Sequence, residues 1–288
     1  MRKLRCILPA LLLGLVLLDG SSTFTVLRDR WFIAPRVGKL NGSSTIRASE
    51  PSERINELLT RRDVLLISGA VGTLDVLPSI SVDGPTVFYT DKNITNGSVL
   101  LRDLKEFMPF VTNFRLRSKL PKMFSHTLHP EFKAYAWADA SFSATDGFVD
   151  ELLESLGTAD AAFAIHPWRQ SVMDELIFME DEIKRGFQYI AQRYAGLPLR
   201  KQVLVYEQMG FPVRDHIPRL LAGGLFIRRN TPQVNAAFDE WFVHNVAFSV
   251  QDQLSLPYVL WKHTLKIGKI PHIYPGRTYK YVGHSNEI

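Results

Sequence analysis

Short apolar runs alternate with stretches of helical periodicity along most of this chain. Five runs are rich in β-branched, aromatic or small apolar residues and end at polar or turn residues, which is typical of buried strands. They lie at 63–70, 86–91, 133–138, 161–165 and 223–227. Because strands that alternate with helices usually pair in parallel, this order predicts an α/β sandwich with a mostly parallel central sheet flanked by helices.

Three of the intervening segments repeat apolar residues at steps of three and four and carry helix start and stop signals. The first is expected at 146–157, with its first residue as the cap. The longest begins at Ser171, has Asp174 in the capping-box position and continues to Gly196. Thr231-Pro232 combines a cap residue with a first-turn proline and predicts a third helix.

The N-terminus combines a basic start, residues 1–5, with an uncharged leucine-rich run that ends at Leu18. This run is shorter than the ~20 residues of a typical membrane span, so it indicates a secretory signal peptide or a short signal anchor at 1–18. Either one keeps the positive flank cytosolic and sends the rest of the chain into the secretory pathway, to the ER or Golgi lumen. A stem or linker is expected at 19–55 and one globular domain at 56–288.

The composition is that of one folded, lumenal domain. Of the 288 residues, 46% are hydrophobic and 22% are charged, which is enough to bury a sizeable core. The net charge of +5 suits an anionic ligand such as a sugar diphosphate, and no basic run is long enough to indicate nucleic acid. Cys6 is the only cysteine, which leaves the mature domain without a disulfide or a cysteine nucleophile. Sequons at Asn41, Asn93 and Asn96 agree with a lumenal location.

Asp139 offers the most informative chemistry of the chain. It directly follows the predicted strand 133–138, and ligands of open α/β sheets bind beyond the carboxyl ends of strands. Nucleotide-sugar transferases place an Asp-x-Asp metal motif at such a strand end, and here Ser141 stands in place of the second acid. Asp139 is therefore a candidate ligand for Mn2+ or Mg2+, with Ser141 binding directly or through water and His272 as a candidate third ligand. The alternative interpretation of Asp139 is a turn or helix-capping aspartate.

A basic stretch upstream supplies candidates for binding an anionic donor. Arg115, Lys119 and Lys122 are spaced four and three residues apart, so they share one face if this stretch is helical. Sugar transfer from a nucleoside diphosphate requires that the charge of the diphosphate be neutralised, and guanidinium and ammonium groups are suited to this. The alternative is a basic face that is simply solvated.

Two further strands carry candidate ligand-binding residues. His166 and Arg169 follow the predicted strand 161–165, where imidazole and guanidinium groups are suited to anionic or hydroxyl-rich ligands. Gly223 and Gly224 begin the last predicted strand, where glycine often marks the close approach of a ligand or of another backbone. For His166 and Arg169 the alternative is a purely structural loop after the strand 161–165. For the two glycines the alternative is tight packing.

Asp252, Gln253 and Glu207 are the candidates for contact with the transferred sugar or its acceptor. Asp252 and Gln253 precede an apolar segment, so they either cap a helix or present polar groups to the sugar. Glu207 lies shortly before a predicted turn that contains Gly210 and Pro212. It is either an ordinary loop acid or a residue that binds the acceptor. A catalytic base for an inverting reaction would be Asp252 or Glu207, and the sequence does not choose between them.

Taken in order, several of these pieces resemble the glycosyltransferase-like domain shared by the turgor-regulation-defect proteins and the mucilage-related glycosyltransferase-like proteins of plants. The resemblance spans roughly residues 60 to 275, and the matching pieces are Asn113–Lys119 with Lys122, Tyr135–Ser141, His166–Arg169 with Asp174-Glu175, Tyr194–Pro198, Phe226–Thr231, Trp241-Phe242 and Gln251–Ser255. The resemblance implies a GT-A-like fold and transfer of a sugar from a nucleotide-sugar donor to a glycan acceptor. It also implies that the Asp-Ala-Ser piece is the metal site and that the Asp-Gln piece lines the sugar pocket.

Two other functions remain open from the sequence. A non-catalytic carbohydrate-binding module would keep the same fold, and the missing second acid favours it. A lipid-amide, ceramide-type hydrolase role has also been attached to this family, but His126, His129 and His166 show no recognisable zinc-site spacing. The chain lacks a P-loop, a Gly-x-Ser-x-Gly elbow and a His-Glu-x-x-His motif, which argues against the enzymes that depend on them. The sequence leaves the oligomeric state open.

Overall fold

The computed structural model describes residues 59–71, 80, 82–91, 100–103, 113–215, 219–270 and 276–282, which all belong to the unit Asn56–Ile288. The predicted leader at 1–18, the predicted stem, the three sequons and His272 lie outside the described residues. Within the described part of the chain, none of the helices has both the length and the apolar character needed to cross a membrane.

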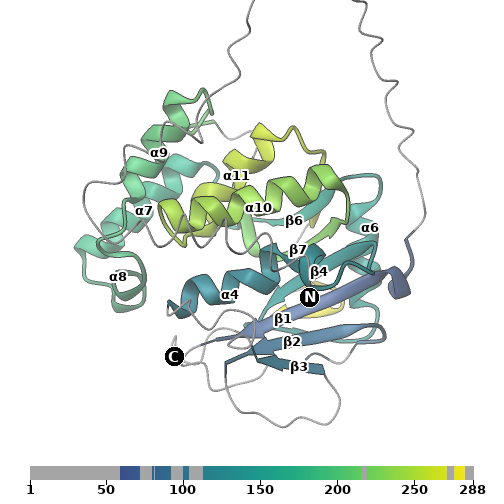
Figure 1. Ribbon diagram of the computed structural model, residues 1–288. Helices are drawn as coiled ribbons and strands as arrows, with labels where there is room; N and C mark the ends of the chain where they lie inside the picture. The colour runs from purple at the N-terminus through teal and green to yellow at the C-terminus, as the bar shows by residue number, and fades with distance from the viewer. Residues whose placement is uncertain are drawn as a thin grey trace, which may run out of the picture. The chain divides into compact units, whose positions relative to one another are not determined.

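A mixed sheet, seven-stranded among the described residues, forms the centre of the unit, in the order β3-β2-β1-β4-β7-β6-β8 (Figure 1). Its strands are β1 Val64–Ala70, β2 Thr86–Thr90, β3 Leu100–Asp103, β4 Ala134–Asp139, β6 Ala161–Ile165, β7 Leu221–Arg229 and β8 Ile267–Ile270. Neighbouring strands run parallel except where β7 lies antiparallel between β4 and β6. The five predicted strands are all present, and the mostly parallel α/β sheet is confirmed. A smaller antiparallel pair joins β5, Phe142–Ala144, to β9, Tyr279–Tyr281.

Helices cover both faces of the sheet (Figure 1). The helices of the described residues are α4 Phe114–Met123, α5 Ser125–Leu128, α6 Phe148–Leu156, α7 Val172–Lys184, α8 Gln188–Tyr194, α9 Leu199–Gln208, α10 Pro232–Ala247 and α11 Asp252–Lys262, and a 3-10 turn, η1, spans Arg61–Asp63. α6 packs on one face, while α4 and α11 contact β1 and β7 on the other and α10 packs against both helices.

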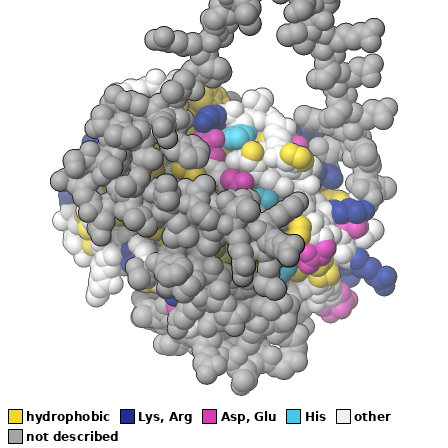
Figure 2. Space-filling model, viewed as in Figure 1, with side chains coloured by type: hydrophobic (Ala, Val, Ile, Leu, Met, Phe, Trp, Pro, Cys, Tyr) yellow, Lys and Arg dark blue, Asp and Glu magenta, His cyan; other side chains and the backbone are white. Residues whose placement is uncertain are grey.

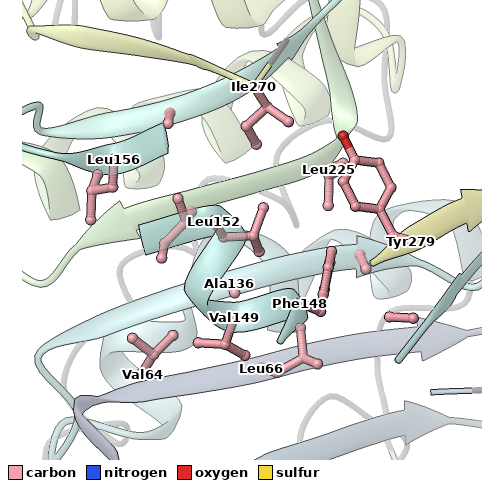
Figure 3. Close-up of a cluster of buried hydrophobic side chains, with 14 of the residues drawn as sticks. Val64, Leu66, Ala136, Phe148, Val149, Leu152, Leu156, Leu225, Ile270 and Tyr279 are labelled. Atoms are coloured by element: carbon pink, nitrogen blue, oxygen red, sulfur yellow. The ribbon is translucent and has the colours of Figure 1, made fainter. Parts of the chain in front are cut away.

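The core under α6 shows how apolar spacing holds distant strands together (Figure 3). Phe148, Leu152 and Leu156 follow one another at steps of four, and each is at most 2% exposed. They share one cluster with Leu66 of β1 and Ile270 of β8. Burial of each such side chain stabilises the fold by about 1.5–3 kcal/mol. The helix α6 therefore helps to hold β1 and the edge strand β8 in one sheet.

Alternation along β4 assigns its side chains to the two faces of the sheet. Ala136 and Ala138 face the α6 core. Trp137 faces the opposite side, where the ammonium group of Lys122 on α4 lies 5.5 Å from the centre of its ring. Asp139, two residues beyond Trp137, therefore also points to the α4 side, at the carboxyl end of the strand.

Two predicted helix boundaries are wrong. The segment 171–196 forms two helices, α7 and α8, because Gly186 between them takes a left-handed φ of +73°. The apolar periodicity continues across this turn, which is why the pattern suggested a single helix. The N-cap of α6 is Gly147 and not Asp146.

The predicted helix starts at Ser171 and Thr231 are confirmed. The hydroxyl of Ser171 accepts the N–H of Asp174 at 3.1 Å, and the Asp174 carboxylate accepts the N–H of Ser171 at 3.0 Å, which completes a capping box. Thr231 caps α10, with Pro232 as its first residue. Side-chain caps of this kind are encoded within four residues, so the sequence is sufficient to predict them.

Candidate functional site

Four predicted site residues meet where the carboxyl end of β4 faces α4 and the start of α11. Lys119 and Lys122 of α4 each place their Nζ 2.6 Å from Oδ2 of Asp252, the first residue of α11. Nζ of Lys122 also lies 3.8 Å from Oδ1 of Asp139. Asp139, Asp252 and two of the three residues predicted to bind the diphosphate thus form one cluster, which we call the Asp139–Asp252 cluster.

Local structure explains why these side chains converge. Asn113 caps α4 by accepting the N–H groups of Arg115 and Leu116, and in the helix that follows Lys119 and Lys122 are three residues apart and share a face. The ammonium group of Lys122 lies between two indole rings, 5.5 Å from the ring centre of Trp137 and 5.5 Å from that of Trp241. Cation–π attraction of this kind stabilises a buried ammonium group.

The charges of the cluster differ in their exposure. The side chains of Lys122, Asp252, Lys119 and Asp139 are 3%, 9%, 15% and 40% exposed. Asp139 is therefore the member that solvent or a ligand reaches most easily. The other three are held in a setting of low dielectric constant, where their mutual attraction is strong.

The pKa values follow from this setting. Burial alone would lower the pKa of Lys122, but the carboxylates of Asp139 and Asp252 outweigh it and raise that pKa above its ordinary value. Burial lowers the pKa of Lys119 despite the attraction of Asp252. Burial would raise the pKa of Asp252, but the two ammonium groups hold it below its usual range. Asp252 is therefore an ionised, weakly basic carboxylate at neutral pH.

Each acid engages one of its oxygens within the cluster or with Trp137. Oδ1 of Asp139 accepts the indole N–H of Trp137 at 2.6 Å, which leaves Oδ2 as its second acceptor. Oδ1 of Asp252 is buried and has no hydrogen-bond partner among the described residues. A buried carboxylate oxygen normally has a partner, so a group that donates a hydrogen bond is expected here.

Gly223 and Gly224 of β7 make room for these two acids. A Cβ atom on Gly224 would lie 2.8 Å from Oδ2 of Asp139, and one on Gly223 would lie 3.0 Å from Cβ of Asp252. Both spacings are too short for a methyl group without displacement of the acid. The two glycines thus pack closely against side chains of the protein itself.

His166 and Arg169 form a second group beside the first. Nδ1 of His166 accepts the backbone N–H of Arg169 at 3.0 Å, and the Arg169 guanidinium pairs with the carboxylate of Glu175. The other oxygen of Glu175 accepts the side-chain N–H of Gln251 at 2.7 Å. Burial, with a further contribution from Arg169, lowers the pKa of His166 to about 3, so this imidazole is neutral. Both predicted ligand-binding side chains are thus engaged within the protein.

Arg115 and Glu207 have other partners than the cluster, and Gln253 lies beside it. The Arg115 guanidinium donates to the carbonyl oxygens of Arg193, at 2.5 Å, and of Gln192, at 3.1 Å, near the end of α8. Glu207, near the end of α9, lies 3.5 Å from Nε of Arg214. Gln253 is half-buried in the first turn of α11, next to Asp252.

Asp139 is the described residue best suited to hold a divalent ion. Its carboxylate is partly exposed, and hard cations such as Mg2+ are often bound through one or two carboxylates, the remaining ligands being phosphate oxygens and water. Ser141 is 3% exposed, and its carbonyl oxygen accepts the N–H of Val282 at 2.7 Å. Within the described residues, no group of three or more His, Cys, Asp or Glu side chains is arranged to hold a metal. An ion held by Asp139 would therefore take most of its other ligands from the substrate and water.

His126 and His129, which precede β4 in the chain, contact residues outside the Asp139–Asp252 cluster. Nε2 of His126 lies 3.2 Å from the carboxylate of Asp239, and Nε2 of His129 lies 2.7 Å from the hydroxyl of Tyr89. On the coloured part of the face in Figure 2, basic and acidic side chains are interspersed.

Three residues that contact the predicted site residues were not themselves predicted as site residues. Trp137 and Trp241 flank the Lys122 ammonium, and Glu175 links Arg169 to Gln251. A signal existed for Trp137, because it lies two residues before Asp139 and strand alternation places both on one face. No local pattern pairs Glu175 with a residue 76 positions away.

Comparison with known proteins identifies the family. The family model described as "TOD1/MUCI70, glycosyltransferase-like domain" matches residues 99–284, which is more than half of the 288-residue chain. The chain belongs to this family. This confirms the predicted family, and the mixed sheet described above confirms the predicted α/β class with a mostly parallel sheet flanked by helices.

Among solved structures, the chain is similar to the apo form of mouse xyloside xylosyltransferase 1. The sequence identity is 11% and the TM-score is 0.40, over 72% of this chain and 84% of that one. No curated protein matches the sequence.

Proposed function

We propose that this protein is a glycosyltransferase that moves a sugar from a nucleotide-diphospho-sugar donor to a glycan or glycoconjugate acceptor. The observation that carries the proposal is the Asp139–Asp252 cluster, in which two acids from β4 and α11 meet on Lys122. The cluster lies at the carboxyl end of β4, where ligands of open α/β sheets bind. Membership of a glycosyltransferase-like family supports the same reaction class.

The donor diphosphate is proposed to bind beside Asp139, Lys119 and Lys122. Cationic groups fixed in a water-poor site stabilise the negative charge that develops on a leaving diphosphate, without reorganising during the reaction. A Mn2+ or Mg2+ ion held by Asp139, with Ser141 as a second candidate ligand, would supply further stabilisation of that charge. Arg115 keeps its predicted diphosphate contact only if it releases the two carbonyl groups near the end of α8.

Asp252 is proposed to orient a sugar hydroxyl. Two lysines fix its Oδ2, while the buried Oδ1 is an acceptor without a partner among the described residues. A hydroxyl that donates to this oxygen would satisfy it and would fix the position of the sugar ring. Because its pKa is lowered, Asp252 is better suited to hold a hydroxyl than to remove its proton. The base role of Glu207 stays a prediction, as does the sugar contact of Gln253.

Binding of a nucleotide with a metal tests the proposal directly. We expect UDP with Mn2+ to raise the melting temperature of the wild type, and Asp139→Ala to abolish the shift. Asp181→Ala is the matched control, because Asp181 is half-exposed on α7 and pairs with Lys184, outside the cluster. A panel of nucleotide sugars then identifies the donor from hydrolysis or transfer. If no nucleotide shifts the wild type, the transferase proposal fails and a carbohydrate-binding module becomes the better account.

We also propose that the chain acts in the secretory pathway, in the ER or Golgi lumen, secreted or held by an N-terminal anchor. The basic start and the apolar run to Leu18 support this, together with the sequons at Asn41, Asn93 and Asn96. A mobility shift on treatment with an N-glycosidase, lost when the three asparagines are replaced by Gln, is the expected result. An unglycosylated cytosolic protein would contradict it.

A further inference from the structure

Trp168 stands out among the aromatic side chains of the described residues. Its side chain is 73% exposed, whereas Trp137 and Trp241 are buried and Trp261 is 40% exposed. Trp168 follows β6, in the loop 166–169. The indole therefore offers a large apolar surface that a ligand can cover with a gain in free energy.

The indole is held and not merely exposed. The backbone N–H of Trp168 donates to Nδ1 of His166 at 3.3 Å, and the two rings meet edge to face, with their centres 5.9 Å apart. His166 itself is only 5% exposed. The guanidinium of the next residue, Arg169, packs over the ring of Phe178, 3.9 Å from its centre. The loop is therefore anchored through His166 and Arg169, which lie before and after Trp168 in the sequence.

Glu175 connects this loop to the Asp139–Asp252 cluster. Its side chain is 1% exposed; one oxygen pairs with Arg169 and the other accepts from Gln251 at 2.7 Å. Gln251 immediately precedes Asp252 and is the N-cap of α11. A single buried carboxylate thus holds both the loop that carries the indole and the helix start that carries the sugar-orienting acid.

The charge of this group indicates what kind of ligand the indole takes. His166 is neutral, and the charge of Arg169 is balanced by Glu175, so the polar groups that hold the loop add no net charge beside the ring. The face of an indole is a flat apolar surface with a negative quadrupole, which suits the C–H face of a pyranose ring. A ring held in place before binding also loses little conformational entropy when the ligand arrives.

We propose that Trp168 is a stacking platform for a neutral pyranose unit of the acceptor glycan. This inference deepens the proposed transferase function and depends on it, because the bound glycan is an acceptor only if the protein transfers a sugar. In this arrangement the acceptor chain lies along the loop 166–169, and its reacting end reaches the Asp139–Asp252 cluster, to which Glu175 ties the loop. Trp168 is then a residue that selects and positions the acceptor and takes no part in the chemistry.

Titrations with oligosaccharides test the platform apart from transfer. The probes are xylohexaose, cellohexaose and hexagalacturonate, followed by tryptophan fluorescence and by protection of the indole from acrylamide quenching. We expect a neutral hexasaccharide to protect wild-type protein, Trp168→Ala to weaken its binding at least about tenfold, and Trp168→Phe to keep most of it. Trp261→Ala is the matched control, an exposed indole at the far end of α11, and should bind like the wild type.

The outcomes separate this inference from the proposed function. Equal binding by wild type and Trp168→Ala overturns the platform, and so does an equal loss in Trp261→Ala. Protection by hexagalacturonate alone, or by none of the three probes, also overturns it, while a UDP–Mn2+ shift in the same samples leaves the transferase proposal intact. Protection by a neutral probe without any nucleotide shift supports the platform and contradicts the transferase. Trp168→Ala should keep the wild-type UDP–Mn2+ shift, which shows that the variant is folded.

Discussion

The ammonium group of Lys122 lies 2.6 Å from Oδ2 of Asp252, although the two residues are 130 positions apart in the chain. Both side chains are largely buried, and Lys119 shares the same carboxylate oxygen. The contact joins α4 to the start of α11, while the second oxygen of Asp252 is buried without a hydrogen-bond partner among the described residues. It also means that the two lysines expected to face a diphosphate are held by a carboxylate when no donor is bound.

Removal of the Lys122 charge should destabilise the fold. In Lys122→Met the side-chain length is nearly kept, but Asp252 and Asp139 lose a buried positive partner. Breaking a buried ion pair on one side typically costs about 3–5 kcal/mol, and the remaining Lys119 places the expected loss near the lower end. Urea unfolding measures it.

The control for this prediction is Lys184→Met, because Lys184 is exposed on α7 and pairs with Asp181 at the surface. Its free energy of unfolding should change by less than about 0.5 kcal/mol. The triple variant Lys119→Met, Lys122→Met and Asp252→Leu should recover part of the loss, since no buried charge of the Asp252 contact is then left without a partner. Equal stability of the wild type and Lys122→Met would refute the ion-pair account.

Gly224→Ala should weaken donor binding with little effect on the fold. The added methyl group would lie 2.8 Å from Oδ2 of Asp139, so the carboxylate must turn away from its present position. We expect the affinity for UDP–Mn2+ to fall by about tenfold, equivalent to about 1.4 kcal/mol, in a calorimetric titration.

Gly223→Ala provides the comparison, because its methyl group would meet Cβ of Asp252 and leave Asp139 untouched. This variant should retain UDP–Mn2+ binding better than Gly224→Ala and should discriminate less between donor sugars. Unchanged UDP–Mn2+ affinity in Gly224→Ala would show that Asp139 has no part in binding the donor.

His166 should make the protein less stable in mild acid. Its pKa is about 3 in the folded protein, because of burial and Arg169, and about 6.5 in an unfolded chain. Between these values the unfolded state binds one more proton, so the free energy of unfolding falls as the pH falls, by up to about 1.4 kcal/mol per pH unit. From pH 7 to pH 5 this contribution is roughly 2 kcal/mol.

His166→Asn should flatten this part of the pH profile, because the amide oxygen still accepts the backbone N–H groups but does not titrate. Urea midpoints at pH 7, 6 and 5 measure both proteins. Parallel profiles for wild type and variant would assign the acid sensitivity to other groups.

Glu175→Gln should affect the acceptor more than the donor. The variant keeps the size of the side chain but removes the charge that holds Arg169, so the loop with Trp168 loses its tie to Gln251 and Asp252. The KM for the acceptor should rise several-fold while the KM for the donor stays within about twofold. Glu180→Gln on the same helix, where Glu180 pairs with Arg200, is the control. A parallel rise in both KM values would point to a general loss of structure.

Much of the architecture could be predicted because its signals are local. The strand run that ends at Asp139 and the capping box of Ser171 and Asp174 each depend on residues within a few positions of one another. The break between α7 and α8 could not be predicted from apolar spacing, because the spacing continues across Gly186. There the backbone conformation of one residue overrides the pattern.

The sequence by itself determined the α/β class, the family, the place of Asp139 at a strand end and the shared helical face of Lys119 and Lys122. Only the tertiary structure decided that both lysines bind Asp252, that Arg115 turns to the end of α8 and that Trp168 remains exposed. The physical reason is the distance along the chain over which each interaction acts. Periodicity and caps act over one or two helical turns, whereas the partner of a buried charge is chosen by which helices pack together and by the cost of leaving that charge unpaired.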